Sequence, residues 1–165
     1  MKPDTPSPSR TRHAGSPMSR ATPDMRDFAE GLIDYEAKES TAPGTRARAA
    51  FHVCEKLRPR LASLLGSAGF SALLGRALAL ATAEIPALRV VQLQADGSLA
   101  VPDGPEAQAA AGKLAEGGVV LVAQLVGLLA AFIGEALMLR VVRGAGPGVI
   151  RGNVSDKGEV YEKKN

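Results

Sequence analysis

The sequence is poor in the side chains that build most binding and catalytic sites. It has no tryptophan, two tyrosines and four phenylalanines among 165 residues, so few rings are present to stack on bases or to fill a large core. Its one cysteine, Cys54, excludes an internal disulfide. The absence of a Gly-X-Y repeat excludes a collagen-like chain. An apolar content of 45% with 22% charged residues excludes disorder over the whole length.

Groups suited to catalysis or metal binding are equally sparse. The two histidines are His13, in a polar N-terminal segment, and His52, on the polar side of a predicted helix. A zinc site needs three or four Cys, His or carboxylate ligands, and these residues with Cys54 do not supply that set. No Gly-x-Ser-x-Gly nucleophile motif is present. We therefore expect no catalytic, cofactor-binding or metal-binding residues, and a protein that is not an enzyme.

Both ends of the chain differ in composition from its middle. Residues 1–26 contain five prolines, repeated Ser/Thr-Pro pairs and almost no apolar side chains, which predicts a disordered tail. They also lack the apolar run of a secretory signal, so a cytoplasmic location is expected. Residues 144–165 open with Gly-Ala-Gly-Pro-Gly and continue mostly polar, which predicts a flexible tail. A single domain then spans residues 27–143, and Met1, Met18 and Met25 are all candidates for the natural start.

Three stretches in the first half of this domain are predicted to be amphipathic helices. Residues 27–39 form a short acidic helix, and residues 46–65 and 70–85 form two longer ones. The run Gly66-Ser67-Ala68-Gly69 forms the turn between the two longer helices, and Pro59 is expected to kink the first of them without ending it. Six leucines are predicted to be mostly buried: Leu57, Leu61, Leu74, Leu78, Leu125 and Leu129.

The next stretch carries a hairpin signal. The sequence Ala95-Asp96-Gly97-Ser98 separates short apolar runs, and Asp-Gly between such runs is typical of a β-hairpin. Pro105 then suits the first turn of a helix that Gly117-Gly118 would end or bend. The predicted fold class is mainly α: a small helical bundle with a long central apolar C-terminal helix and a short β-hairpin near residues 90–101.

The most apolar helix is predicted over residues 119–143. Its sequence, VVLVAQLVGLLAAFIGEALMLRVVR, is apolar nearly all round, which is typical of a helix at the centre of a bundle or within a membrane. The uncharged run over residues 117–134 is at the lower limit of length for crossing a bilayer. Ala123, Gly127 and Ala131 recur at a spacing that permits close approach of a neighbouring helix.

Two polar residues interrupt this helix and are the candidate functional residues. Gln124 and Glu135 share one side of the predicted helix at about 16 Å from each other, so each needs its own partner. We favour Arg76, on the 70–85 helix, as the ion-pair partner of Glu135, in a buried pair or at a dimer seam. The alternatives are a polar stripe that faces solvent and a proton-handling or ligand site.

The stretches GRALALATAEIPALRVVQLQADGSL and EGGVVLVAQLVGLLAAFIGEALMLRVVR are similar to uncharacterised small helical proteins of high-GC bacteria. This resemblance covers residues 55–143 and implies no activity and no catalytic residues. It supports only the assignment of that stretch to the folded domain.

Three functional classes follow from these features. The favoured class is a non-enzymatic helical interaction or accessory module with a protein partner or self-association, because two apolar-faced helices need a third helix to cover them. The second is a membrane-associated protein anchored by residues 118–142. The third is a nucleic-acid-binding protein. Its support is weaker, because the net charge of +3 is spread in blocks and the 70–85 helix offers few polar side chains to read bases.

Overall fold

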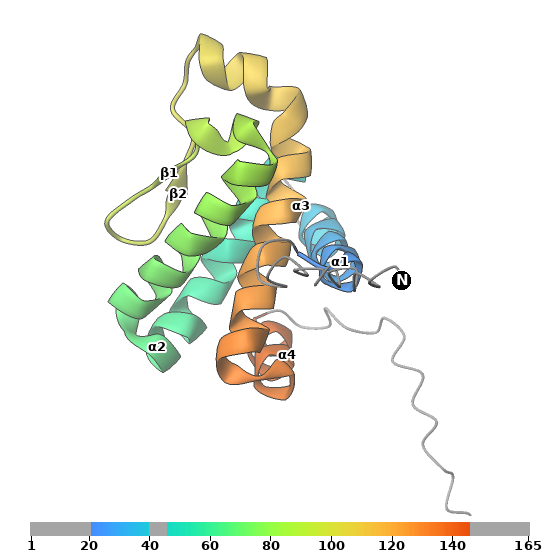
Figure 1. Cartoon of the computed structure of the whole chain (residues 1–165), viewed down its shortest axis with the longest axis vertical. Helices are drawn as coiled ribbons and strands as arrows, with labels where there is room; N and C mark the ends of the chain where they lie inside the picture. Colours follow the sequence, from blue (N-terminus) through green and yellow to red (C-terminus); the bar gives the residue numbers. More distant parts are fainter. Residues whose placement is uncertain (1–20, 40–45, 146–165) are drawn as a thin grey trace, which may run out of the picture.

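The computed structural model describes residues 21–39 and 46–145. These residues form four α-helices, a short 3-10 helix and a two-stranded hairpin (Figure 1). The predicted mainly α fold class is confirmed. Most of the two predicted tails, residues 1–20 and 146–165, lies outside the described residues.

Helix α1 (Pro23–Glu39) starts four residues before the predicted boundary of the domain. Pro23 stands at the first helical position, where a missing N–H costs nothing, and Thr22 Oγ1 accepts a hydrogen bond from a backbone N–H of the first turn. Arg26 forms an ion pair with Glu84 at the end of α2 (Arg46–Glu84). The helix predicted over residues 27–39 therefore begins earlier, at Pro23.

Helix α2 consists of two halves that form a V, joined at Gly66 (Figure 1). Gly66 has φ 76° and ψ 158°, a combination that residues with a Cβ rarely adopt, and the chain turns sharply there. The predicted helices over 46–65 and 70–85 are therefore present, but a single glycine joins them in place of a four-residue turn. The first half continues as a helix through Pro59.

The segment after α2 forms the short 3-10 helix η1 (Pro86–Val90) and then the predicted hairpin. Strand β1 (Gln92–Leu93) pairs antiparallel with β2 (Leu99–Ala100). Gln92 stands opposite Ala100, and Leu93 stands opposite Leu99.

The turn of the hairpin is closed by local hydrogen bonds and rests on α2. Asp96 Oδ1 accepts hydrogen bonds from the backbone N–H of Ser98 at 2.9 Å and from its hydroxyl at 2.6 Å. These bonds hold the pKa of Asp96 below its usual value. Gly97, at φ 81°, is buried so closely against Phe70 of α2 that a Cβ there would lie 3.3 Å from the ring. Arg58 of α2 donates a hydrogen bond to the Asp96 carbonyl.

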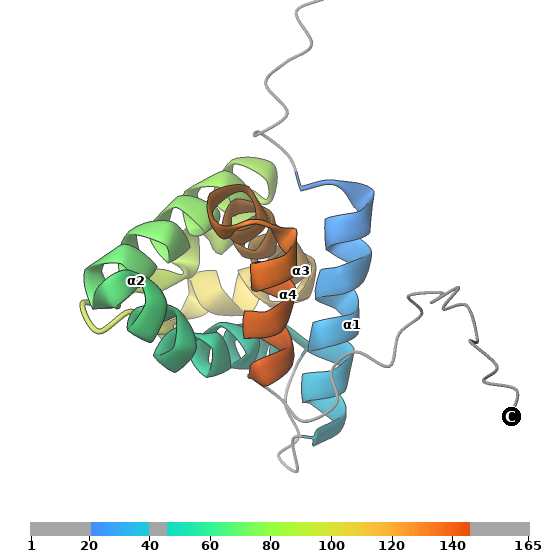
Figure 2. The same ribbon diagram turned by 90° about the horizontal axis from the view of Figure 1, so that it is seen from below.

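Helix α3 (Pro105–Ile133) is the central element and contacts every other described helix (Figures 1 and 2). It begins at Pro105 as predicted, but it continues through Gly117 and Gly118, where an end or bend was expected. Both glycines are points of close packing. A Cβ on Gly117 would lie 2.8 Å from Leu88 of η1, and a Cβ on Gly118 would lie 2.7 Å from the Cβ of Ala50 in α2. The predicted end of the helix was wrong because these glycines admit a neighbouring element, although Figure 1 shows that α3 changes direction after its first turns.

The predicted apolar helix over residues 119–143 is divided at Gly134. This glycine has φ 84° and ψ 152°, ends α3 and precedes α4 (Glu135–Gly144). Helix α4 lies across one end of the bundle, next to the end of α3 (Figure 2). We call this end the base; it is also the end at which α2 turns at Gly66 (Figure 1). A single continuous helix over residues 118–142 is therefore not formed.

The core lies between α3 and the helices that surround it. Residues 120–126 of α3 are buried on all sides, which is what the central helix of a bundle requires. Of the six leucines predicted to be buried, Leu78 is half-buried. The other five are buried: Leu57, Leu61, Leu74, Leu125 and Leu129.

Candidate interaction surface

The structure separates the three residues that the sequence singled out. Gln124 is only 4% exposed, and its Nε2 has no hydrogen-bond partner among the described residues. Glu135 is exposed as the first residue of α4, and Arg76 is exposed on the second half of α2. Neither forms an ion pair within residues 21–39 and 46–145. The predicted Glu135–Arg76 pair is therefore not formed, because the break at Gly134 turns Glu135 out to solvent.

Cys54 and His52 are not arranged for catalysis. Cys54 is buried, and burial, together with the charge of Glu55, raises the pKa of its thiol to about 12. Such a thiol is protonated and unreactive at neutral pH. The side chain of His52 is half exposed, with its Nδ1 3.7 Å from Glu36 Oε1. Across the described part of the chain, no three His, Cys, Asp or Glu side chains gather closely enough to hold a metal ion.

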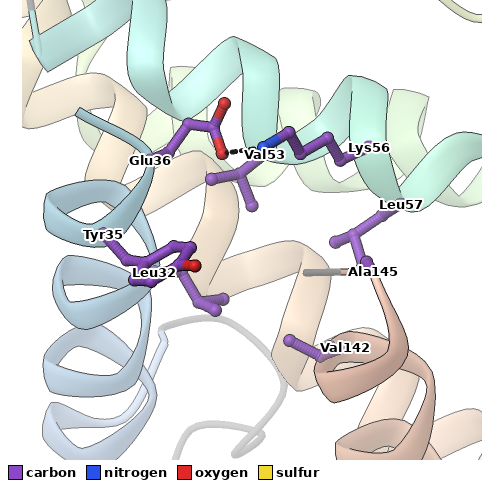
Figure 3. Close-up of a pocket in the computed structure, with 8 residues that line it drawn as sticks. All are labelled: Leu32, Tyr35, Glu36, Val53, Lys56, Leu57, Val142 and Ala145. Atoms are coloured by element: carbon purple, nitrogen blue, oxygen red, sulfur yellow. Dashed lines mark hydrogen bonds and ion pairs between the residues drawn. The ribbon is translucent and has the colours of Figure 1, made fainter. Parts of the chain in front are cut away.

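An ion pair between a buried glutamate and a half-exposed lysine joins α1 to the first half of α2 (Figure 3). Glu36 is 6% exposed, and its Oε2 accepts a hydrogen bond from Lys56 Nζ at 2.6 Å. The cavity beside this pair, lined also by Tyr35 and by Val142 of α4, has a volume of about 30 Å³. That space holds about one or two water molecules. The pair is therefore a structural link between helices, with no room for a substrate.

A wider groove of about 590 Å³ lies toward the opposite end, between the first half of α2, the chain after β2 and the start of α3. The polar side chains along it include Arg48, His52 and Asp103, and all three are exposed. A ligand site usually orients its ligand with a few polar groups inside a mostly apolar pocket. This groove has the form of an open depression between helices.

The base carries the most exposed large apolar side chains of the described structure. Phe132 is 70% exposed, Leu64 is 48% exposed and Leu137 is 38% exposed. They belong to the last turn of α3, the end of the first half of α2 and the first turn of α4. Each lies within three residues of Gly66 or Gly134. The helix break removes the following turn beside Leu64 and Phe132 and the preceding turn beside Leu137, so part of each side chain is left uncovered.

Exposed arginines accompany these apolar side chains. Arg76 and Phe132 line the same shallow groove of about 310 Å³, together with Leu65 and Leu73. Arg60 lies against Gly144 at the end of α4. We define the basal surface by seven residues: Leu64, Phe132, Leu137, Arg60, Arg76, Arg140 and Arg143. Its four arginines are exposed and form no ion pair with another described residue.

Sequence reasoning did not find this surface, although one signal for it was present. The two stretches that build the base, residues 56–83 and 117–145, contain a single acidic residue, Glu135. Apolar side chains in long helices were assigned to the core, and only the breaks at Gly66 and Gly134 show which of them are left uncovered.

No protein-family model, curated protein or solved structure matches this chain.

Proposed function

We propose that the protein is a non-enzymatic helical interaction module that works in the cytoplasm and docks on an acidic partner through its basal surface. The observation that carries this proposal is the exposure of Phe132 beside Arg76, which has no ion-pair partner in the described structure. Apolar side chains exposed together on one face mark interaction sites, and arginines and aromatic residues are enriched in interfaces.

The chemistry of the other polar groups supports a non-enzymatic role. The Glu36 carboxylate is used by Lys56, and the Cys54 thiol is held protonated by burial. Arg26 and Glu84 are likewise paired with each other. These groups hold helices together, so they are not available as acids, bases or nucleophiles for a substrate.

Association with a membrane is the second candidate, and the apolar helices favour it. By length and composition alone, α2 and α3 could each cross a bilayer, although α2 turns sharply at Gly66. However, 61% of the most apolar window of α3 is buried inside the protein, and the break at Gly134 divides the predicted anchor over residues 118–142. A spanning α3 would also place the amide of Gln124 in hydrocarbon. We therefore favour docking over spanning.

Site-specific photocrosslinking tests the proposed function. A photoreactive amino acid at position 132 is expected to give covalent adducts in cells, whereas the same group at Ala109, on the exposed start of α3, is expected to give few. Adducts at position 132 should fall when Arg140 and Arg143 are both changed to glutamate. The same adduct yield at positions 109 and 132 would contradict docking through the base.

Fractionation separates docking from spanning. We expect the protein in the soluble fraction or released from membranes by alkaline carbonate. Retention until detergent is added would instead show a spanning helix and overturn this part of the proposal.

A further inference from the structure

We propose that the partner of the basal surface is an anionic phospholipid bilayer, so that the protein binds membranes peripherally with its base facing the lipid. Resting on the proposed function, this assignment names the partner class. A bilayer surface presents phosphates above hydrocarbon. The basal surface presents the complementary groups, with guanidinium groups beside protruding apolar side chains.

The charge of the described chain is unevenly distributed along the sequence, with two basic residues and one acidic residue in residues 46–55. The stretches that build the base, residues 56–83 and 117–145, contain six basic residues and one acidic residue. Helix α1 and residues 84–116 contain eleven acidic residues and four basic ones. A negatively charged plane attracts basic groups within a Debye length and repels acidic ones. Such a plane therefore orients the molecule with the base toward the lipid.

Two of the six basic residues of these stretches are used in ion pairs inside the protein, and the other four are not paired with any described residue. Lys56 is paired with Glu36, and Arg58 is paired with Glu55 and with Asp96 of the hairpin turn. The remaining basic residues of these stretches are the four arginines of the basal surface. Each arginine near an anionic membrane surface strengthens binding by about fivefold, and its guanidinium donates paired hydrogen bonds to phosphate oxygens.

The apolar residues of the basal surface suit insertion at the boundary between lipid headgroups and acyl chains. Leu137 and Arg140 stand one turn apart on the outer side of α4, while Met138 and Val142 are buried against the bundle. Helices that lie in a membrane interface insert apolar side chains at the boundary of headgroups and acyl chains, and arginine extends its aliphatic stem beside them. Phe132 protrudes from a helix end, and a fluid bilayer accommodates a protruding ring without a preformed pocket.

Other anionic or apolar partners fit less well. A second copy of the chain would bring the same four arginines to a two-fold contact, which like-charge repulsion disfavours. Duplex DNA offers phosphates but no apolar surface for Leu64 and Leu137. The experiments below distinguish binding to these partners from binding to a bilayer.

The absence of tryptophan makes a direct test possible. In the full-length protein, Phe132→Trp introduces a single indole at the base, and Ala109→Trp introduces one at the exposed start of α3. With vesicles of phosphatidylcholine and phosphatidylglycerol, we expect a blue shift of emission and quenching by brominated lipid at position 132 and neither at position 109. With phosphatidylcholine alone we expect no shift. A shift at both positions, or at position 109 alone, would overturn docking through the base.

Charge reversal provides the matched control. Arg140→Glu with Arg143→Glu and Arg89→Glu with Lys113→Glu change the net charge equally, at the base and away from it. We expect the basal pair to weaken sedimentation with anionic vesicles more than tenfold and the other pair to weaken it less than threefold. All four positions are exposed, and the Lys113–Glu116 pair that one variant loses lies at the surface, so thermal unfolding should change little. Equal losses would show that net charge alone drives binding and would overturn the proposal.

The two proposals fail in distinguishable ways. Photocrosslinks from position 132 to protein, with no blue shift on vesicles, would refute the bilayer and keep the interaction module. A blue shift on duplex DNA or on concentrating the protein alone, without one on vesicles, would assign nucleic acid or self-association. Absence of both adducts and any shift would refute both proposals.

Discussion

Four glycines of α3 provide a sharp test of how closely this helix packs. At Gly112 and Gly127, no atom lies within 4 Å of the point that a Cβ would occupy, whereas at Gly117 and Gly118 the nearest neighbours lie at 2.8 and 2.7 Å. Replacing glycine by alanine inside a helix stabilises it by about 1 kcal/mol, since the unfolded chain loses less entropy on folding. The change in the free energy of unfolding caused by Gly→Ala is therefore expected to be positive at some positions of α3 and negative at others.

At Gly112 and Gly127, alanine is expected to raise the free energy of unfolding by about 0.5–1 kcal/mol. At Gly118, the new methyl group would meet the Cβ of Ala50 at 2.7 Å, with the backbone of Ala47 behind it at 3.8 Å. Overpacking of a tight core costs about 1–3 kcal/mol, and a short rigid side chain such as Ala50 cannot turn aside. We therefore expect Gly118→Ala to lower the free energy of unfolding by about 1–2 kcal/mol.

Urea unfolding followed by far-UV circular dichroism measures these changes, with Gly112→Ala as the control. Ala50→Gly combined with Gly118→Ala moves the methyl group from α2 to α3, so the double-mutant cycle should show a favourable coupling of about 1 kcal/mol. If Gly118→Ala were as stabilising as Gly112→Ala, the close approach of α2 and α3 would be refuted.

Three further substitutions and one reaction test single residues. Gln124→Leu is expected to raise the free energy of unfolding by about 1 kcal/mol, because it removes a buried Nε2 that has no partner among the described residues; a loss in urea titrations would reveal a hidden partner. Glu135→Gln should change stability by less than about 0.5 kcal/mol. Glu36→Gln should lower the free energy of unfolding by about 1 kcal/mol, because it breaks the ion pair with Lys56, whose own side chain is partly exposed. Equal melting temperatures for Glu36→Gln and Glu135→Gln would contradict this difference between the two carboxylates. Cys54, with its pKa raised to about 12, should react with a thiol reagent near neutral pH only after unfolding; rapid labelling of the native protein would refute its burial.

Much of the fold was predictable because the relevant physics is local. Leucines at helical spacing on one face of residues 46–65 and 70–85 favour a core, and of the four chosen there Leu57, Leu61 and Leu74 are buried and Leu78 is half-buried. The Asp96-Gly97 turn was predictable for a similar reason. Asp96 bonds the backbone two residues on, and Gly97 adopts the positive φ that the turn requires.

The roles of individual glycines were not predictable from local sequence. Gly117-Gly118 and Gly134 all lie in apolar, helix-forming surroundings, yet the first two admit another element and the third ends α3 and turns the chain into α4. Which role applies depends on whether a neighbouring helix approaches, and that is a tertiary property. The error then spread to the candidate site. Gln124 and Glu135 share a stripe only on a continuous helix, and the break between them leaves one buried and the other in solvent.

The break at Gly134 links the stability of the fold to the proposed function. A helix that continued past Ile133 would carry Met138 and Val142 away from the bundle, and the turn at Gly134 instead brings them to 2% exposure each. Burying two side chains of this size is worth about 3–6 kcal/mol, more than the hydrogen bonds and helix propensity lost at one glycine. The same turn leaves Phe132 without a following helical turn to cover it. A polar residue would serve stability equally well at that position, because a ring 70% exposed gains little from burial. The exposed ring therefore contributes little to folding, and we propose that it is retained for the interaction described above.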